Sequence, residues 1–93
     1  MNVQLRNGDD LVRNVVIVDS VRTAIGRLGG TLGNETSDYL GAHVIKSLLE
    51  RTNIDKNEID EVILGEAKQS ADASNVARVA QLRAGLPVEI PAY

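Results

Sequence analysis

Few residues in this chain could do chemistry, and most of them stand alone. His43 is the single histidine, and no second ligand lies at metal-binding spacing, so a packed or surface histidine is favoured over a metal ligand. Asp9-Asp10 and Asp60-Glu61 are adjacent carboxylates, whose side chains would point to opposite faces of a strand, so neither pair predicts an acid/base couple. The chain has no cysteine, which excludes a disulfide framework, a thiolate metal site and a cysteine nucleophile within these residues.

A glycine-rich segment, Gly26 to Gly30, has the composition of a phosphate-binding loop without its pattern. It lacks the G-x-G-x-x-G spacing, no Gly-Lys-Ser/Thr follows, and the gap between the flanking strand and helix is too long for a dinucleotide turn. Glycines that supply positive φ in a long surface loop are the favoured interpretation. A nucleotide-binding α/β domain remains an alternative.

Arg78 is the remaining candidate. It falls near the first turn of an expected helix, where the helix dipole disfavours a cation by a few tenths of a kcal/mol. A guanidinium at such a position is expected to reach a carboxylate or carbonyl across an interface. A solvated arginine is the alternative.

The elements that must position these residues belong to one small domain of 93 residues. The apolar fraction is 43%, but it includes no Phe, no Trp and only two Tyr, so the core lacks the large side chains that usually supply buried area. We therefore expect the chain to bury a face against another segment or subunit. The net charge of −3 and the scattered basic residues predict neither a nucleic-acid surface nor a membrane-surface helix. The polar first residues and the absence of a long apolar run predict a soluble, cytoplasmic protein.

The hydrophobic pattern predicts an α/β fold with the order β-α-β-α-β. Residues 1–13 are expected to form a flexible arm, and Val15 to Val18 read as a strand buried on both faces, as in a parallel sheet. A domain of residues 14–93 then contains, in order, a strand at 14–20, a long connection at 21–36, a helix at 38–51 capped by Thr36 or Ser37, a helical turn at 55–58, a strand at 62–65, a helix at 75–84 capped by Ser74, and a strand that begins at 88–93.

Two details of these helices are specific enough to test. Gly41 in the first helix is expected to permit close packing against a neighbour, because glycine costs about 1 kcal/mol of helix propensity relative to alanine. Gly85 is placed where a left-handed residue ends the second helix, and Pro87 comes two residues later. Parallel strands joined by right-handed helical crossovers are the expected packing.

Six segments of the chain share their order and spacing with a known family. They are Val15-Val16-Ile17-Val18, Val21-Arg22-Thr23-Ala24-Ile25-Gly26-Arg27 with Gly29-Gly30, Asp60-Glu61-Val62-Ile63-Leu64-Gly65, Asn75-Val76-Ala77-Arg78, Ala84-Gly85-Leu86-Pro87 and Pro91-Ala92. Together they resemble the N-terminal part of a thiolase, the family of acetyl-CoA acetyltransferases and 3-ketoacyl-CoA thiolases. The resemblance runs from Val15 to Tyr93, and it departs from the family at Ala24 and Val76, where proline is common, and in the loop from Gln69 to Ser74, which lacks glycines.

The resemblance implies a partial thiolase half-domain with mostly parallel strands, incomplete without downstream segments. In the family a reactive cysteine comes shortly after the position of Tyr93, at a helix N-terminus that lowers the pKa of its thiol. A second cysteine and a histidine from the C-terminal half transfer protons, and oxyanion holes stabilise the developing charge. The resemblance therefore assigns no catalytic, cofactor-binding or metal residue to this chain, and it makes a coenzyme A thioester the substrate of the complete enzyme.

The resemblance also implies partners. The remainder of the fold would come from a separate chain or a longer parent polypeptide, and the complete enzyme would be a homodimer or tetramer with Gln69, Asn75 and Arg78 near the subunit interface. The predicted function is the N-terminal part of an acyltransferase that condenses or thiolytically cleaves acyl-CoA thioesters. Alone, these residues are expected to be inactive and to need the rest of the fold for stability. The alternative is a truncated, non-catalytic scaffold or subunit-interaction module.

Overall fold

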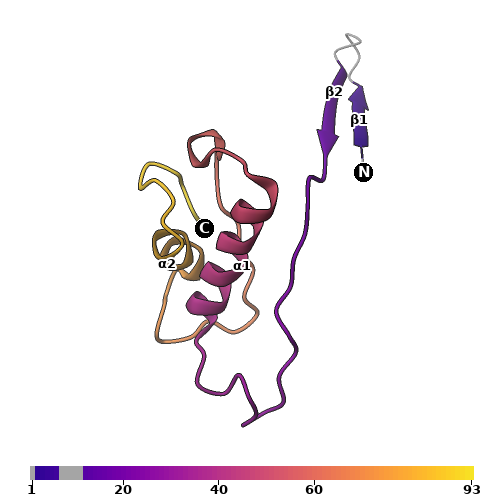
Figure 1. The fold of residues 1–93 in the computed structure, drawn as a ribbon. Helices are drawn as coiled ribbons and strands as arrows, with labels where there is room; N and C mark the ends of the chain where they lie inside the picture. Colours follow the sequence, from indigo (N-terminus) through magenta and orange to yellow (C-terminus); the bar gives the residue numbers. More distant parts are fainter. Residues whose placement is uncertain (1, 7–11) are drawn as a thin grey trace.

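The computed structural model describes residues 2–6 and 12–93 of the chain. These residues form, in order, strands β1 (Asn2–Arg6) and β2 (Val12–Val16), helix α1 (Ser37–Thr52), a 3-10 helix η1 (Lys56–Glu58) and helix α2 (Val76–Arg83). The two α-helices pack into one body, and the β1–β2 hairpin projects away from it (Figure 1). The radius of gyration is 15.9 Å, against about 12 Å for a compact domain of this length. The chain therefore spreads more surface than a closed domain would.

Helix α1 confirms the predicted first helix and extends it by one residue at each end. Thr36 takes the N-cap position, although its side chain makes no capping hydrogen bond. At the other end Asn53 adopts a left-handed φ of 55°, and its N–H donates to the Leu49 carbonyl at 2.9 Å. Asparagine tolerates this conformation better than most residues, which explains why the helix ends there.

The short turn after α1 is also confirmed, as η1. Its N-cap is Asp55, whose side-chain oxygen accepts a hydrogen bond from the Asn57 backbone N–H at 2.9 Å. A carboxylate that satisfies a free N–H at the start of a helix is the expected role of aspartate in this position.

Helix α2 begins one residue later than predicted, and Ser74 as its cap is wrong. Asn75 is the N-cap, because its Oδ1 accepts a hydrogen bond from the Arg78 backbone N–H at 3.1 Å. Asparagine and serine are comparable caps, so composition alone does not distinguish the two neighbouring positions.

The end of α2 confirms the predicted left-handed Gly85, which has a φ of 82°. The Gly85 N–H donates to the Leu82 carbonyl at 3.1 Å, and the Leu86 N–H donates to the Gln81 carbonyl at 3.2 Å. This pair of bonds is the Schellman pattern, in which the left-handed residue lets the chain turn back over the last helical turn. The turn directs residues 86–90 across the end of α2.

The contact between α1 and α2 is made by small side chains. A Cβ atom added to Gly41 would lie 3.1 Å from the Ala80 Cβ and 3.4 Å from the Leu64 Cδ1, so Gly41 does permit the close approach that was predicted. Ala80 is fully buried at this contact. The buried apolar side chains are correspondingly small, with five alanines among eight: Ala42, Ala73, Val76, Ala77, Ala80, Ala84, Leu86 and Ile90.

The predicted first strand differs from the observed one. β2 pairs antiparallel with β1, in a register that places Val3 opposite Val15 and Asn2 opposite Val16, and it ends at Val16. Ile17 and Val18 are 61% and 64% exposed, so the prediction of a strand at 14–20 buried on both faces is wrong for the described structure. The physical reason is that a central strand needs neighbours on both sides, and among the described residues none lies beside Ile17 or Val18 as a sheet partner.

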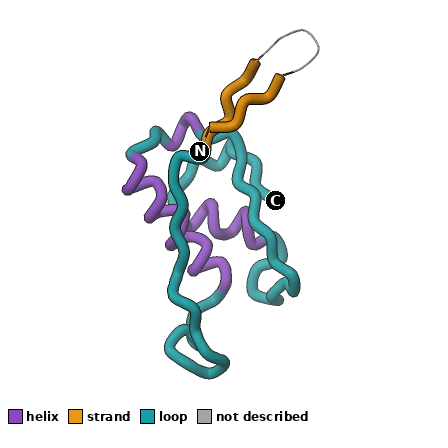
Figure 2. Tube along the Cα trace, turned by 90° about the vertical axis from the view of Figure 1, so that its right-hand side faces the viewer, coloured by secondary structure: helices purple, strands orange, loops and turns teal. Residues whose placement is uncertain are grey.

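The other two predicted strands are reduced to one short parallel contact. Val62 and Ala92 form an isolated parallel bridge, and most of the chain outside the helices is loop (Figure 2). The fold is therefore a partial α/β unit, and the full β-α-β-α-β order with mostly parallel strands is not reproduced in the residues that the structure describes. The parallel direction of the second and third segments agrees with the predicted crossover packing.

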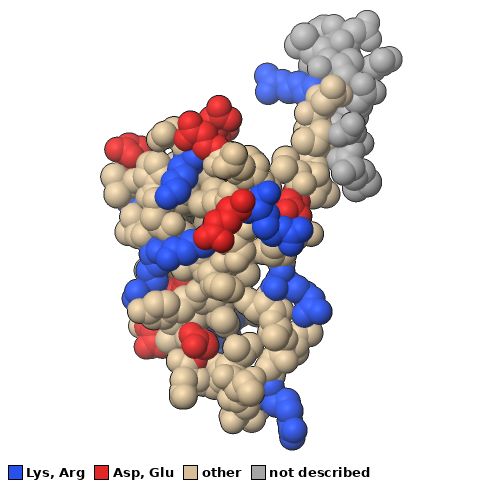
Figure 3. Space-filling model, viewed as in Figure 1, with Lys and Arg blue, Asp and Glu red and all other residues tan. Residues whose placement is uncertain are grey.

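Charged side chains are interspersed over the face shown in Figure 3, where basic and acidic residues alternate with uncharged ones. Within the described ranges neither α-helix combines the length and the hydrophobicity that a membrane crossing requires. The same residues hold no cluster of three His, Cys, Asp or Glu side chains placed to bind a metal ion, and His43 is exposed on α1.

Candidate functional site

The side chain of Gln81 in α2 is a buried polar group with several hydrogen-bond partners. It is fully buried, and its Nε2 donates hydrogen bonds to the carbonyls of Pro87 and Ile90, at 2.9 Å and 2.7 Å. Both acceptors belong to the turn after the helix. A buried amide is tolerated only when its hydrogen bonds are made, and here both of its N–H groups are used.

Arg78 lies one turn earlier on α2 and acts on the same turn. Its Nη1 is 2.9 Å from the Val88 carbonyl, 3.1 Å from the Ile90 carbonyl and 3.0 Å from Oε1 of Gln81. The sequence predicted that this guanidinium reaches a carboxylate or carbonyl across an interface, and the structure instead shows it bonded to carbonyls of its own chain. We call Arg78, Gln81 and the turn at residues 87–90 the α2 clamp.

The α2 clamp leads directly into residues 91–93, which lie beside residues 62–64. The Val62 N–H donates to the Pro91 carbonyl at 3.0 Å, the Tyr93 N–H to the Val62 carbonyl at 3.1 Å, and the Leu64 N–H to the Tyr93 carbonyl at 3.1 Å. Asn75, the N-cap of α2, adds a bond from its Nδ2 to the Ala92 carbonyl at 3.1 Å. The 91–93 segment is thus held from both sides.

The Tyr93 side chain makes a further bond to the neighbouring segment. Its hydroxyl donates to Oε2 of Glu61 at 3.0 Å. This hydrogen bond, followed by the negative charge of Glu61 and by burial, holds the pKa of Tyr93 above its ordinary value of 10.0. Tyr93 therefore stays protonated at neutral pH and serves as a donor.

The three residues predicted at a subunit interface are not all brought together. Gln69 and Asn75 line one cavity of about 300 Å³, together with Tyr93 and the start of α2. Arg78 does not line this cavity, because its guanidinium is engaged in the α2 clamp. The interface role of these residues stays a prediction.

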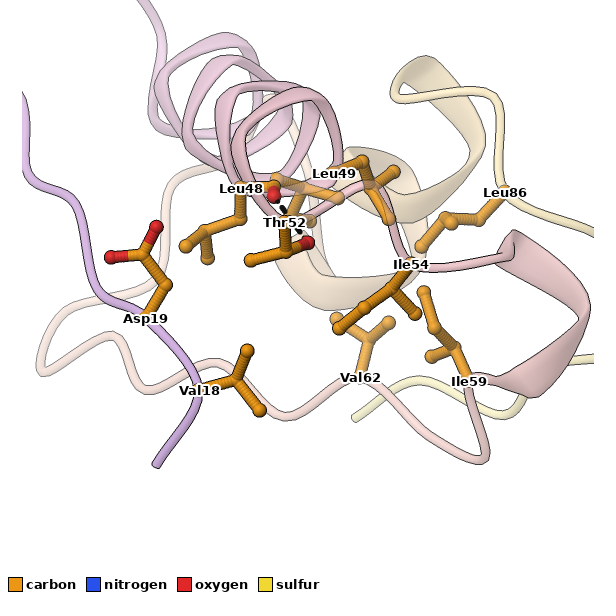
Figure 4. A pocket seen from close by; sticks show the side chains of 10 residues that line it. Val18, Asp19, Leu48, Leu49, Thr52, Ile54, Ile59, Val62 and Leu86 are labelled. Carbon is orange, nitrogen blue, oxygen red and sulfur yellow. Dashed lines mark hydrogen bonds between the residues drawn. The ribbon is translucent and has the colours of Figure 1, made fainter. Parts of the chain in front are cut away.

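An apolar groove of about 220 Å³ lies beside the C-terminal half of α1 (Figure 4). Its charged residue, Asp19, is paired with Arg51 at 3.0 Å, so the groove presents mainly aliphatic side chains and offers packing rather than chemistry. Its lining consists of Val18, Asp19, Ile45, Leu48, Leu49, Thr52, Ile54, Ile59, Val62 and Leu86.

An ion pair between the buried Asp38 and the exposed Arg83 joins the start of α1 to the end of α2. Oδ2 of Asp38 lies 2.7 Å from Nε of Arg83, and the Arg83 guanidinium lies 4.2 Å from the centre of the Tyr39 ring. The Thr36 side chain makes the largest contribution that lowers the pKa of Asp38 below its ordinary value of 3.8. Burial raises this pKa, whereas the Asp38 backbone and Arg83 lower it further. Each partner also suits its helix end, with the carboxylate in the first turn of α1 and the cation in the last turn of α2.

The lowered pKa of Asp38 predicts a loss of stability in acid. Because the folded pKa lies below the unfolded one, the stabilisation is complete above about pH 4 and is lost as the pH falls through the folded pKa. At pH values below about 4, we expect the unfolding temperature of the protein to decrease as the pH is lowered. The unfolding temperature of Asp38→Asn should decrease less over the same pH range. Thermal unfolding of both proteins by circular dichroism from about pH 7 to pH 2 tests this. Parallel curves for the two proteins would contradict it.

None of the clustered side chains described above carries out bond chemistry by itself. The clamp, the ion pair and the Tyr93 contact hold backbone segments in place. Sequence reasoning missed Gln81, although a glutamine among the alanines of α2, three residues after Arg78, is a usable signal of a buried polar contact. It also missed the pairing of Asp38 with Arg83, because two residues so far apart in the sequence leave no local pattern that would indicate their contact.

Comparison with known proteins places this geometry in a family. Residues 15–93 match the family model described as thiolase, N-terminal domain. An acetyl-CoA acetyltransferase of Pseudomonas aeruginosa is 46% identical over 81 residues, which are 87% of this chain and 21% of that protein. An acetyl-CoA acetyltransferase of Escherichia coli is 47% identical over 75 residues, 81% of this chain and 19% of that protein.

A solved structure supports the same assignment. The crystal structure of the Bacillus anthracis acetyl-CoA acetyltransferase superposes with a TM-score of 0.78 at 41% identity, over 84% of this chain and 20% of that one. The chain thus spans about a fifth of the length of the relatives it matches. Because the family model covers nearly all of the chain, from residue 15 to residue 93, the protein belongs to the thiolase family.

Proposed function

We propose that these residues are the N-terminal part of a thiolase-type acyltransferase that condenses or thiolytically cleaves acyl-CoA thioesters. The observation that carries the proposal is the match of residues 15–93 to the N-terminal domain of thiolases, together with relatives named acetyl-CoA acetyltransferase that are more than 40% identical. The substrate of the complete enzyme is then a coenzyme A thioester.

In this proposal the nucleophile is a cysteine that lies beyond Tyr93. These 93 residues contain no cysteine, and their clustered polar groups hold backbone rather than react. Their contribution is to support the segment that carries the thiolate, which takes the acyl group from acyl-CoA and releases the thiol of coenzyme A. The α2 clamp fits this role because it fixes residues 87–90 directly before the 91–93 segment.

The proposal extends to assembly and location. The apolar groove and the exposed Ile17 and Val18 are surfaces that the remainder of a thiolase fold would cover. The complete enzyme is a cytoplasmic homodimer or tetramer of fatty acid metabolism, and the cavity lined by Gln69 and Asn75 lies at or near its subunit interface.

A chimeric enzyme tests the proposed function. The full 93-residue chain replaces the matched segment of the Pseudomonas aeruginosa acetyl-CoA acetyltransferase, and the purified protein is assayed for thiolysis of acetoacetyl-CoA. We expect a kcat within about tenfold of the natural enzyme, which corresponds to about 1.4 kcal/mol in the barrier. The matched control is the same chimera with its reactive cysteine replaced by serine, which should be inactive. A folded, oligomeric chimera without thiolysis would instead favour the non-catalytic scaffold.

A further inference from the structure

Gln81 has a role that packing does not explain. Its neighbours on the buried face of α2 are Ala77, Ala80 and Ala84, so an apolar side chain would suit this face at least as well. Replacing hydrogen-bonded partners by apolar groups is often neutral for stability. A fully buried glutamine that spends both N–H groups on the carbonyls of Pro87 and Ile90 therefore serves the placement of those carbonyls.

The orientation of the Gln81 amide is set by Arg78. The guanidinium lies 3.0 Å from Oε1 of Gln81, and an arginine has only donors. Oε1 must therefore face Arg78, which directs Nε2 toward the turn. The two side chains act together, with Arg78 on the carbonyls of Val88 and Ile90 and Gln81 on those of Pro87 and Ile90.

The held turn controls the position of the segment after it. The Ile90 carbonyl accepts hydrogen bonds from both Arg78 and Gln81. The next residue is Pro91, whose carbonyl accepts a hydrogen bond from the Val62 N–H at 3.0 Å. A shift of the turn would therefore displace the start of the 91–93 segment. Geometry at a reacting centre is sensitive to such shifts, since a misplacement of about 1 Å can cost about a hundredfold in rate.

We propose that Gln81 is a positioning residue for acyl transfer. It fixes the turn at 87–90, and through it the 91–93 segment and the chain that continues toward the nucleophile. The inference rests on the proposed function, in which the cysteine comes after Tyr93. Gln81 acts through the backbone and does not touch the substrate.

The test uses Gln81→Met in the chimeric enzyme, because methionine keeps the length of the side chain and favours the helix while it removes both donors. We expect kcat to fall about tenfold to a hundredfold with KM changed by less than about twofold. We also expect the backbone N–H groups of Ile90 and Tyr93 to exchange with solvent at least about tenfold faster, as a locally opened segment does.

The matched control is Ala42→Gly, which removes a buried methyl group from α1 and lowers its helix propensity without touching the clamp. It should lower the thermal midpoint and leave kcat within about twofold. If the parent chimera is active, the proposed function is upheld. An unchanged kcat in Gln81→Met would then overturn the inference about Gln81 alone. An equal loss of kcat in Ala42→Gly would also overturn it, because a general loss of stability would then suffice. An inactive parent chimera would refute the proposed function instead, and unchanged exchange at Ile90 and Tyr93 would overturn the inference even then.

Discussion

Replacing Ala80 with leucine is expected to lower the free energy of unfolding of the α1–α2 body by about 1–3 kcal/mol, or more if the helices cannot separate. Ala80 is fully buried, and its Cβ lies 3.1 Å from the position of a Cβ at Gly41. Three additional carbon atoms have no space at this contact. The overpacking must move one helix away from the other, and with it the buried alanines on both.

This loss is large relative to the total free energy of unfolding of the α1–α2 body. Stability of about 0.05–0.15 kcal/mol per residue gives only a few kcal/mol for a unit of this size, and an alanine-rich core has little apolar area in reserve. Amide hydrogen exchange in the chimeric enzyme measures the effect as faster exchange throughout α1 and α2. The control is Ala71→Leu, the same change at an exposed position, which should stay within about 0.5 kcal/mol. Equal protection of α1 and α2 in both variants would contradict the prediction.

Arg78→Ala is expected to lower the stability of the α2 clamp by about 3 kcal/mol or more. The substitution removes charged hydrogen bonds to the carbonyls of Val88 and Ile90, each of a kind worth about 1.5–3 kcal/mol, and it leaves Oε1 of Gln81 without its donor. The effect should appear as faster amide exchange at residues 87–93. Arg51→Ala is the control, because Arg51 forms a surface ion pair with Asp19 and such pairs are worth about 1 kcal/mol or less.

The same variant separates two roles of Arg78. An intrachain role, as the observed hydrogen bonds indicate, predicts a loosened 87–93 region with an unchanged dimer or tetramer, measured by native mass spectrometry. A change of oligomeric state without local loosening would favour the interface role that the sequence suggested. If neither the amide exchange at residues 87–93 nor the oligomeric state changed, both roles of Arg78 would be refuted.

The local features of the fold were predictable because they depend on residues close in sequence. The periodic apolar residues of α1, the aspartate at the start of η1 and the glycine after α2 each give a signal within a few positions. The structure confirms these elements to within about one residue, apart from the cap of α2. There two equivalent caps, Ser74 and Asn75, stand side by side, and only the observed bond from the Arg78 N–H decides between them.

The strands were harder to predict because their state depends on distant partners. Val15 to Val18 have the composition of a central strand, but composition does not supply neighbours, and β2 instead ends at Val16 in a hairpin with β1. The candidate site was missed for the same reason. Gln81 and Arg78 bond to carbonyls, which every residue has, so their partners become visible only when the turn at 87–90 is folded back over α2.

The hairpin has a consequence for how this chain meets other strands. β1 takes up the backbone hydrogen-bonding groups along one side of Val12–Val16, and it lies before the region shared with thiolases, which begins at residue 15. An apolar strand with two open sides is a template for uncontrolled pairing between molecules. With one side of Val15 and Val16 closed by β1, a newly arriving strand has a single side to join at these residues, and both sides become open only from Ile17 onward. The hairpin thus limits intermolecular strand pairing at Val15 and Val16 to one side, and that side stays open for the strand that completes the sheet.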